Sequence, residues 1–331
     1  MASKALITGG AGFIGFHLAR ELAGRGVAVV LVDNFARGVQ DAELEELVAG
    51  PDVTLLKRDL LDANALGDLP DDCDHIYHLS AIIGVEHVLE RPYQVLADNT
   101  RMLIHAIELG RRQANLKRFV FASTSEVYAG TLRHFSLETP TPETTPLAVT
   151  PLEEPRTSYM LSKIYGEALC RHSGLPFTLI RPHNFYGPRM GLAHVIPQLL
   201  ERAYRSDDGS EFEVYSVDHR RTFIFIEDAV QIIRLAADSE SCEGQVLNVG
   251  NQTPEMAIGD LADLVLRIVG RKLHVVARPA TPGSPARRCP DMAKTTGLTG
   301  YAPRVSLEDG IARTFRWYVD NVFSGAGVSA R

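Results

Sequence analysis

Short apolar runs alternate with segments of helical spacing through the first half of the chain. Runs that are apolar at nearly every position are typical of strands buried on both faces of a parallel sheet. The pattern predicts strands at residues 5–8, 27–32, 53–57, 75–79, 118–122 and 177–181, and the main helices between them at residues 13–23, 93–112 and 158–171. The expected fold class is therefore α/β, a doubly wound parallel sheet of the Rossmann type with helices on both faces.

The alternation breaks down after Arg181, where prolines and short segments interrupt the pattern. Helices are still expected at residues 195–203, 227–237, 258–269 and 307–320. We predict a sheet domain at residues 1–180 and a smaller C-terminal lobe at residues 181–331, with part of 222–250 returning to the first domain. Residues 139–155 are rich in proline and threonine, and a loop of that length inside a domain is expected to be a lid or a binding loop.

Composition excludes several classes of protein. The 331 residues carry a formal net charge of −7 and no run of basic residues longer than two, which argues against a nucleic-acid partner. No apolar run is long enough for a membrane span, and a strand within the first residues leaves no room for a signal peptide, so we expect a cytoplasmic protein. The four cysteines lack metal-site spacing, which predicts reduced thiols and no metal site.

A glycine-rich motif, GGAGFIG at residues 9–15, lies between the first strand and the first helix. Gly9, Gly12 and Gly15 permit a tight turn, close approach to a pyrophosphate and packing of the helix on the sheet. Asp33 ends the second strand about 18 residues after Gly15, where a carboxylate accepts the adenosine ribose hydroxyls and repels a 2′-phosphate. The combination predicts NAD rather than NADP as the cofactor.

Other residues follow the same edge of the predicted sheet. Asp59 comes after the third strand and Leu79–Ala81 after the fourth, so both are expected beside a dinucleotide, although Asp59 alternatively caps the next turn. Tyr159 and Lys163 are four residues apart and share one face of a helix. An ammonium beside a phenol favours the phenolate, so the pair predicts a general base whose pKa is lowered.

Five motifs in order resemble one family: GGAGFIG, STSEVY at 123–128, YMLSK at 159–163, RPHNFYGP at 181–188 and RRTFIFIEDA at 220–229. Over residues 3–320 the chain resembles the extended short-chain dehydrogenases/reductases, which include the nucleotide-sugar epimerases, dehydratases and decarboxylases. The resemblance implies that Thr124 orients the sugar 4-hydroxyl, Tyr159 removes its proton and Lys163 binds the nicotinamide ribose.

The resemblance also implies two sets of binding residues. The expected NAD contacts are Gly9, Gly12, Phe13, Ile14, Gly15, Asp33, Asn34, Asp59, Leu60, Leu79, Ala81, Asn99, Tyr159 and Lys163. The expected substrate contacts, to a UDP-sugar in the favoured interpretation, are Ser125, Asn184, Tyr215, Arg221 and Arg288. His87, His183 and His194 also fall near the expected pocket, where we interpret them as packing or hydrogen-bonding residues.

Glu126 reduces the number of family reactions that the sequence favours. Thr124-Ser125-Glu126 resembles GDP-mannose 4,6-dehydratase and the UDP-glucuronate decarboxylases, and residues 287–291 resemble a decarboxylase segment in which an arginine, here Arg288, joins the glutamate around the substrate carboxylate. A UDP-glucuronate-type decarboxylase acting through a 4-keto sugar is the leading hypothesis, and 4-epimerisation and 4,6-dehydration stay open. Cys289 replaces a lysine of that segment, and the loop at 130–156 also departs from the family.

The sequence leaves two other functions open and also predicts an oligomeric state. A non-catalytic NAD-sensing module and a net oxidoreductase are the alternatives to a redox-neutral enzyme. The resemblance implies a homodimer that pairs through the helices at 93–112 and 158–171. Leu103, Ile107, Leu161, Ile164 and Leu169 fit such a contact, although they could equally pack on the sheet.

Overall fold

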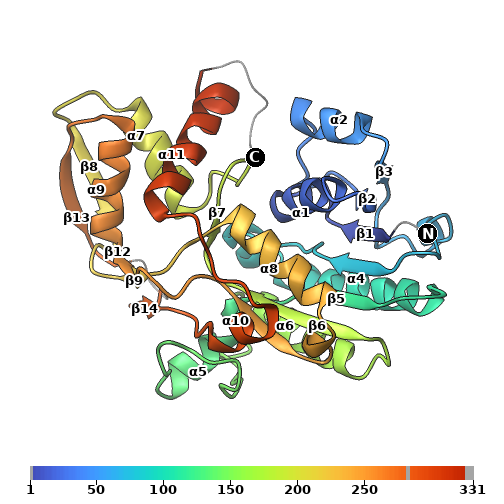
Figure 1. The fold of residues 1–331 in the computed structure, drawn as a ribbon. Helices are drawn as coiled ribbons and strands as arrows, with labels where there is room; N and C mark the ends of the chain where they lie inside the picture. The colour runs from blue at the N-terminus through green and yellow to red at the C-terminus, as the bar shows by residue number, and fades with distance from the viewer. Residues whose placement is uncertain (1–2, 281–283, 325–331) are drawn as a thin grey trace.

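The computed structural model describes residues 3–280 and 284–324. Its centre is a seven-stranded parallel sheet in the order β3-β2-β1-β4-β5-β6-β11 (Figure 1). The order reverses direction between β1 and β4, and ligands of open α/β sheets bind beyond the carboxyl ends of the strands at such a point. The predicted fold class is confirmed.

The strands of the sheet are β1 (Lys4–Thr8), β2 (Ala28–Asp33), β3 (Val53–Lys57), β4 (His75–His78), β5 (Arg118–Ala122), β6 (Phe177–Pro182) and β11 (Val246–Val249). The helices that accompany them are α1 (Phe13–Ala23), α2 (Ala42–Ala49), α3 (Val85–Glu90), α4 (Pro92–Arg112), α5 (Ala129–His134), α6 (Thr157–Arg171) and α8 (Ile226–Asp238), with short 3-10 turns η1 (Ala63–Leu66), η2 (Ser125–Tyr128) and η3 (Glu240–Cys242).

Helices cover both faces of the sheet. Successive side chains of a strand point to opposite faces, so each strand contributes to the apolar cluster on either side. On β1, Ile7 belongs to the cluster that contains the apolar faces of α1 and α8, whereas Leu6 belongs to the cluster under α4 and α6. Leu103 and Ile107 of α4 are almost fully buried in that second cluster. Of the two placements foreseen for these residues, the structure shows packing on the sheet, because the apolar face of α4 covers the strands.

The C-terminal lobe is built from β7 (Phe185–Tyr186), α7 (Val195–Arg205), β8 (Glu211–Tyr215), β9 (Arg220–Arg221), β10 (Ile224–Phe225), β12 (Met256–Ala257), α9 (Ile258–Val269), β13 (His274–Arg278), β14 (Arg287–Arg288), α10 (Ala293–Thr299), α11 (Leu307–Tyr318) and the π-helical turn η4 (Val319–Phe323). Strands β8 and β13 pair in parallel, and β9 lies between β12 and β14. The register of the latter sheet places Arg288 directly beside Arg221.

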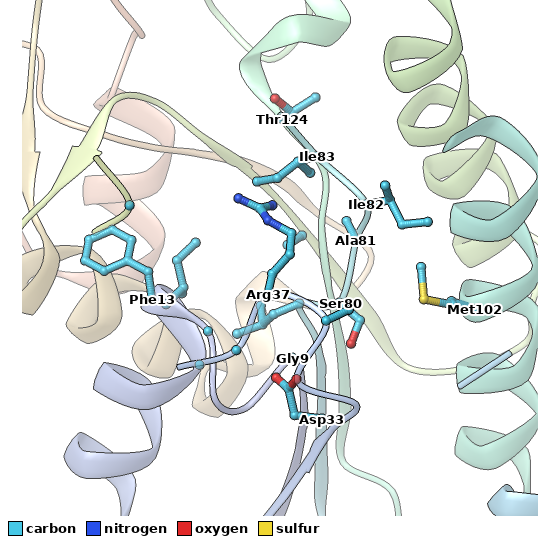
Figure 2. Close-up of a pocket in the computed structure, with 18 of the residues that line it drawn as sticks. Gly9, Phe13, Asp33, Arg37, Ser80, Ala81, Ile82, Ile83, Met102 and Thr124 are labelled. Carbon is cyan, nitrogen blue, oxygen red and sulfur yellow. The ribbon is translucent and has the colours of Figure 1, made fainter. Parts of the chain in front are cut away.

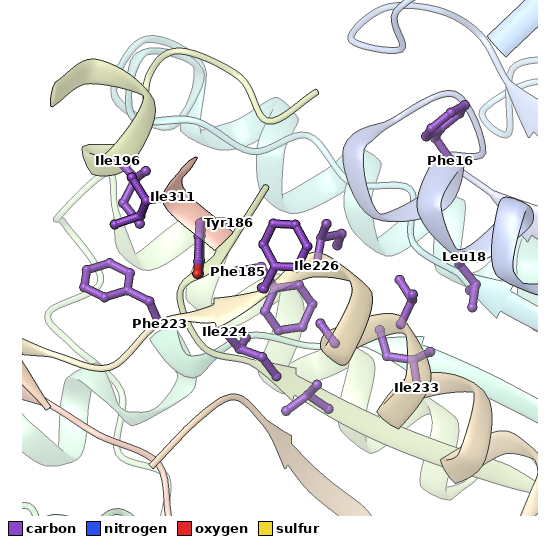
Figure 3. Close-up of a cluster of buried hydrophobic side chains, with 14 of the residues drawn as sticks. Phe16, Leu18, Phe185, Tyr186, Ile196, Phe223, Ile224, Ile226, Ile233 and Ile311 are labelled. Carbon is purple, nitrogen blue, oxygen red and sulfur yellow. The ribbon is translucent and has the colours of Figure 1, made fainter. Parts of the chain in front are cut away.

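One apolar core joins the lobe to the sheet. Figure 3 shows Phe16 of α1 and Ile233 of α8 in the same cluster as Tyr186 of β7 and Ile311 of α11. Residues 222–250 contribute β11 to the edge of the seven-stranded sheet and α8 to the helices that cover it. The domain boundary near Arg181 stays a prediction.

Polar contacts tie the lobe to the turn that follows β2. The guanidinium of Arg189 pairs with Asp41, with Nε 2.9 Å from Oδ2, and donates to the carbonyl of Val39 at 3.0 Å. Arg189 also lies over the ring of Phe16, 3.8 Å from its centroid. A buried, charge-assisted contact of this kind is costly to break from one side, so it holds the turn in place.

The sequence predicted some helices with the right bounds and missed other elements. The predicted helices at 13–23 and 258–269 match α1 and α9 to the residue, whereas α2 and β11 were not predicted. The signal for α2 was present, because Asp41 caps it by accepting from the N–H of Leu44 at 2.9 Å. No helix in the described ranges combines the length and apolarity needed to cross a bilayer. The cytoplasmic location stays a prediction.

Candidate active site

A groove of about 760 Å³ opens at the carboxyl ends of the strands, between β1 and β4 and facing the C-terminal lobe (Figure 2). Its walls contain the glycine turn, the end of β2, the loop after β4, the end of β5 and the first turns of α6. Every residue predicted for catalysis, cofactor or substrate lines it except Asn99, Tyr215 and Arg221.

The glycine turn is shaped so that only glycine fits at two positions. Gly9 has φ +70°, and a Cβ on Gly15 would lie 2.2 Å from the carbonyl oxygen of Gly9. Gly12 is the N-cap of α1 and has no side-chain capping bond, so the first N–H groups of the helix are open toward the groove. Such an N-terminus favours an anion, and the cradle fits a dinucleotide pyrophosphate.

Asp33 stands at the end of β2, as predicted. Its carboxylate accepts from the N–H of Ala11 at 3.0 Å and from the N–H of Phe35 at 2.8 Å. Burial raises the pKa of Asp33, and these two hydrogen bonds oppose the rise. The carboxylate is therefore fixed at the groove wall, where it suits ribose hydroxyls.

Asp59 caps the next turn, and its contact with a dinucleotide stays a prediction. One of its oxygens accepts from the N–H of Leu61 at 2.9 Å, which caps the next turn, and the other accepts from the amide of Asn34 at 3.1 Å. Both Asp59 and Asn34 line the groove.

Asn99 lies behind the wall rather than in it. It is buried on α4, accepts from the N–H of Ile82 at 2.7 Å and donates to the Ile82 carbonyl at 3.1 Å. Its amide also donates to Ser162 at 3.3 Å. Asn99 therefore fixes the backbone of the loop after β4, which does line the groove.

Tyr159 lies in the first turn of α6, and its side chain is hydrogen-bonded with that of Thr124. Burial raises the pKa of the Tyr159 phenol to about 12, while the Thr124 bond and the charge of Arg37 act in the opposite direction. The prediction of a lowered pKa was therefore wrong for this structure, because desolvation of the phenolate outweighs the neighbouring groups.

Lys163 is engaged elsewhere. Its ammonium donates to the carbonyl of Ala122 at 2.8 Å, and it lies 5.8 Å from the centroid of the Tyr159 ring. Complete burial lowers the pKa of Lys163 to about 8. The spacing brought the two side chains together as predicted, but the ammonium points at the end of β5 and not at the phenol oxygen.

A carboxylate surrounded by arginines forms one end of the groove. Arg288 lies 2.8 Å from Glu126, and this neighbour is the main reason why the pKa of Glu126 is lowered. The charges of Arg156 and Arg221 lower it further. Burial together with the charge of Arg288 lowers the pKa of Arg221 to about 10. Three cations around one carboxylate leave a local excess of positive charge.

Sequence reasoning paired Glu126 with Arg288 and missed Arg156. Arg156 is the N-cap residue of α6, the helix that carries Tyr159. Its charge is near Glu126 only in the folded chain, because the two residues are thirty positions apart in the sequence. Arg221 lies just outside the groove wall, where it donates to Ser284 at 2.9 Å and to the carbonyl of Pro285 at 2.6 Å.

The remaining predicted substrate residues divide into two groups. Ser125 and Asn184 line the groove, and Asn184 adopts a positive φ of 44° with its amide donating to the carbonyl of Thr222 at 2.8 Å. Tyr215 is 50% exposed on β8, away from the groove wall. Cys289 is buried and turned from the groove, so its replacement of a lysine does not alter the wall.

The three histidines differ in setting. His183 is buried, its Nε2 lies 3.0 Å from Asn248, and burial lowers its pKa to about 3, which agrees with a packing role. His87 and His194 line the groove. The cysteines at 73, 170, 242 and 289 are buried free thiols.

The loop at 139–155 is not a lid over the groove. None of its residues lines the groove, and instead Thr141 bonds the backbone of Cys289 and Glu143 accepts from the N–H of Asn248 at 2.8 Å. The earlier interpretation was wrong because these contacts clamp the loop onto β11 and the segment before α10.

A buried ion pair supports the end of β5. Arg181 binds Glu167 through two bonds of 2.8 and 2.7 Å, and Ser123 donates to the same carboxylate at 2.7 Å. Glu167 lies one turn after Lys163 on α6. The network thereby fixes α6 against the strand that precedes Thr124.

Comparison with known proteins gives a consistent picture. Residues 5–250 match the NAD dependent epimerase/dehydratase family. The chain is 33% identical to a UDP-N-acetyl-alpha-D-glucosaminuronate decarboxylase of Bacillus cytotoxicus, over 96% of this chain and 98% of that one. It is 30% identical to UDP-glucuronic acid decarboxylase 1 of Arabidopsis thaliana, over 98% of this chain and 72% of that one.

Solved structures show the same fold. A dTDP-glucose 4,6-dehydratase of Streptomyces venezuelae, solved with NAD and TYD bound, has a TM-score of 0.82 at 25% identity, covering 96% of this chain and 97% of that one. A variant of a UDP-glucuronic acid 4-epimerase of Bacillus cereus, in complex with a fluorinated UDP-glucuronic acid and NAD, has the same score and identity over 96% and 99% of the two chains.

Proposed function

Because the chain belongs to the NAD-dependent epimerase/dehydratase family, we propose that this enzyme decarboxylates a UDP-hexuronic acid, with UDP-glucuronate as the leading substrate. The reaction passes through a transient 4-keto sugar and is redox-neutral overall. The observation that carries the proposal is the Glu126–Arg288 pair with Arg221 and Arg156 around it.

The charge balance of that cluster supports a substrate with its own carboxylate. Two of the three arginine charges are not neutralised by Glu126, and the mutual repulsion of Arg221 and Arg288 is part of the reason why the pKa of Arg221 falls. An entering carboxylate relieves this repulsion, whereas a neutral hydroxymethyl group does not. Arginine also suits a carboxylate because its fork donates two parallel hydrogen bonds.

The cofactor site supports NAD. The glycine turn and the N-terminus of α1 would hold the pyrophosphate, and Asp33 would accept the ribose hydroxyls and repel a 2′-phosphate. Bound there, NAD supplies the acceptor for the hydride that leaves sugar C4 and the donor that later returns it. Asn99 contributes indirectly, by holding the loop after β4.

We propose roles for the chain's own residues that carry over those implied by the family resemblance. Thr124 orients the sugar 4-hydroxyl, and Tyr159 takes its proton. Lys163, held by the Ala122 carbonyl, is directed to the nicotinamide ribose. Ser125 and Asn184 line the groove and are assigned to the sugar and its diphosphate. Arg221 and Tyr215 lie outside the wall, so their assignment to the phosphates and to the base rests on the resemblance alone.

Decarboxylation then needs little more than orientation. With a ketone at C4, the C6 carboxylate is a β-keto acid; the C5–C6 bond breaks, its electrons move to the C4 oxygen as an enolate, and CO2 leaves. A proton added at C5 restores the ketone. Arg288 and Glu126 position the carboxylate so that the breaking bond aligns with the carbonyl.

Mass spectrometry of the products tests the reaction. The protein is incubated with UDP-glucuronate, UDP-N-acetylglucosaminuronate or UDP-glucose, each with NAD or with NADP. We expect a product lighter by one CO2 from a uronate with NAD, a weaker reaction with NADP, and no accumulation of reduced cofactor.

Each other outcome assigns a different function. A product lighter by one water makes the enzyme a dehydratase, and a product of equal mass that separates as a C4 epimer makes it an epimerase. Reduced cofactor that climbs with turnover indicates a net oxidoreductase. Binding of NAD with no conversion of any nucleotide-sugar favours the sensing module and overturns the proposal.

We also propose a homodimer formed through the outer faces of α4 and α6, which pack side by side. Tyr93 and Ile104 of α4 and Tyr165 of α6 are exposed apolar residues, at 71%, 38% and 61%. Analytical ultracentrifugation of the wild type should give the mass of two chains, and Tyr165→Asp should shift it toward one. A monomeric wild type at micromolar concentration would contradict the dimer.

A further inference from the structure

We infer that Arg37 binds the diphosphate of a nucleotide that enters the groove, a role outside the glycine motif and independent of which sugar reaction follows. Arg37 lies in the turn between β2 and α2, four residues after Asp33. Figure 2 shows its side chain running into the groove between Phe13 and the loop that carries Ser80, with the guanidinium directed toward Ile83 and Thr124.

Arg37 is one of two arginines on the groove wall, with Arg91, for which the described part of the chain provides no side-chain hydrogen-bond or ion-pair partner. Lys163 donates to Ala122, Arg189 pairs with Asp41 and Arg288 pairs with Glu126. Arg37 has no hydrogen-bond or ion-pair partner in the described ranges 3–280 and 284–324. The groove walls remove enough solvent to lower the pKa of Arg37, although the residue as a whole is exposed. A bound anion would remove this penalty.

The backbone that carries Arg37 is fixed although its side chain is free. The N–H of Val39 donates to the carbonyl of Ala11 at 3.2 Å, and Arg189 holds the Val39 carbonyl at 3.0 Å and the carboxylate of Asp41 at 2.9 Å. Gly38 packs so closely on Asp33 that a Cβ there would lie 2.8 Å from its carboxylate. The turn therefore presents Arg37 to the groove from a defined point.

A diphosphate is the anion that fits this position. The charge of Arg37 acts on Tyr159 at one wall and on His194, the N-cap of α7, at the other. Its charge therefore acts across the space between α6 and the C-terminal lobe, next to the glycine turn that also lines the groove. A dinucleotide and a nucleotide-sugar both contain a diphosphate, and the planar fork of arginine suits its oxygens.

Calorimetry without turnover tests this inference and separates the two sources. ADP-ribose and adenosine report on the cofactor side, and UDP and uridine report on the substrate side. We expect Arg37→Ala to weaken binding of at least one diphosphate by about ten- to a hundred-fold, the loss typical of a charge-assisted contact, and to leave both nucleosides unchanged. Arg37→Lys should recover part of the loss, because it keeps the charge without the fork.

The pattern of losses decides the outcome. A loss confined to ADP-ribose assigns the cofactor diphosphate, a loss confined to UDP assigns the substrate diphosphate, and a loss in both assigns shared contact. Unchanged binding of both, or an equal loss for the nucleosides, overturns the inference. Arg25→Ala is the matched control, because Arg25 is an exposed arginine that pairs with Glu21 at the far end of α1. Since nothing is converted, failure here leaves the proposed decarboxylation untouched, and the reverse also holds.

Discussion

Replacing Tyr159 by phenylalanine is expected to lower turnover of the nucleotide-sugar by about a hundred- to ten-thousand-fold, the range for loss of a general acid–base group. The substitution removes the hydroxyl that is hydrogen-bonded with Thr124 and leaves the ring and the helix in place. NAD affinity, measured by calorimetry, should stay near the wild-type value because the glycine turn and Asp33 are untouched.

The pH dependence sharpens this test. Burial raises the pKa of Tyr159 to about 12, so only a small fraction is phenolate near neutral pH, and that fraction grows as the pH rises. Wild-type kcat/KM should therefore increase with pH up to about 8, where half of the Lys163 side chains have lost their charge. The residual activity of Tyr159→Phe should lack this slope.

A control and a contrary result are available. Tyr204→Phe removes a hydroxyl from a tyrosine of α7 that packs on Phe315 and Phe323, far from the groove wall, and should leave turnover unchanged. Activity of Tyr159→Phe within a few-fold of the wild type, with the wild-type pH slope, would show that another group takes the proton.

The second large effect is expected at Arg288. Arg288→Met should weaken binding of UDP-glucuronate by about ten- to a hundred-fold, since a charge-assisted contact contributes about 1.5–3 kcal/mol, and should slow loss of CO2 at least as much. UDP-glucose has no carboxylate, so its affinity should change little. The ratio of the two affinities, measured by calorimetry, isolates recognition of the carboxylate.

The neighbouring arginine provides a matched control. Arg287 pairs with Glu255 at 2.6 and 2.8 Å and does not line the groove, so Arg287→Met should preserve the preference for the uronate. The Glu126–Arg288 pair is partly exposed, at 44% and 23% of the side chains, so neither variant is expected to unfold the protein. If Arg288→Met weakened UDP-glucose as much as UDP-glucuronate, the arginine would not be a carboxylate ligand.

Glu126→Gln separates the two members of the pair. The amide keeps the shape and removes the negative charge, so it leaves the arginines less neutralised and should tighten binding of the uronate while altering its conversion. Weaker binding of UDP-glucuronate to Glu126→Gln would indicate that the carboxylate of Glu126 organises Arg288 more than it opposes the substrate.

The fold and the cofactor motif followed from the sequence because they depend on local chemistry. Buried parallel strands have near-continuous apolar runs, and the turn at Gly9–Gly15 admits only glycine where a Cβ would strike the backbone. The position of Asp33 follows from the length of α1 and β2. Strand β11 was not predicted because it has only four residues, three of them apolar, and so short a run in an irregular region carries no period that identifies a strand.

The chemistry at the groove depended on contacts between distant segments. The four-residue spacing brings Tyr159 and Lys163 to one helix face, but the raised pKa of the phenol is a consequence of burial by the surrounding elements. The loop at 139–155 was misread because its anchors, Asn248 and Cys289, lie about a hundred residues or more away.

The sequence by itself determined the α/β class, the dinucleotide motif and the pairing of Glu126 with an arginine of the C-terminal segment, because each has a local or family-wide signature. Only the tertiary structure decided the electrostatics. The packing of β14 beside β9 sets Arg288 next to Arg221, and the turn clamped by Arg189 directs Arg37 into the groove. Charge interactions depend on distance and desolvation, and neither quantity can be obtained from the order of residues along the chain.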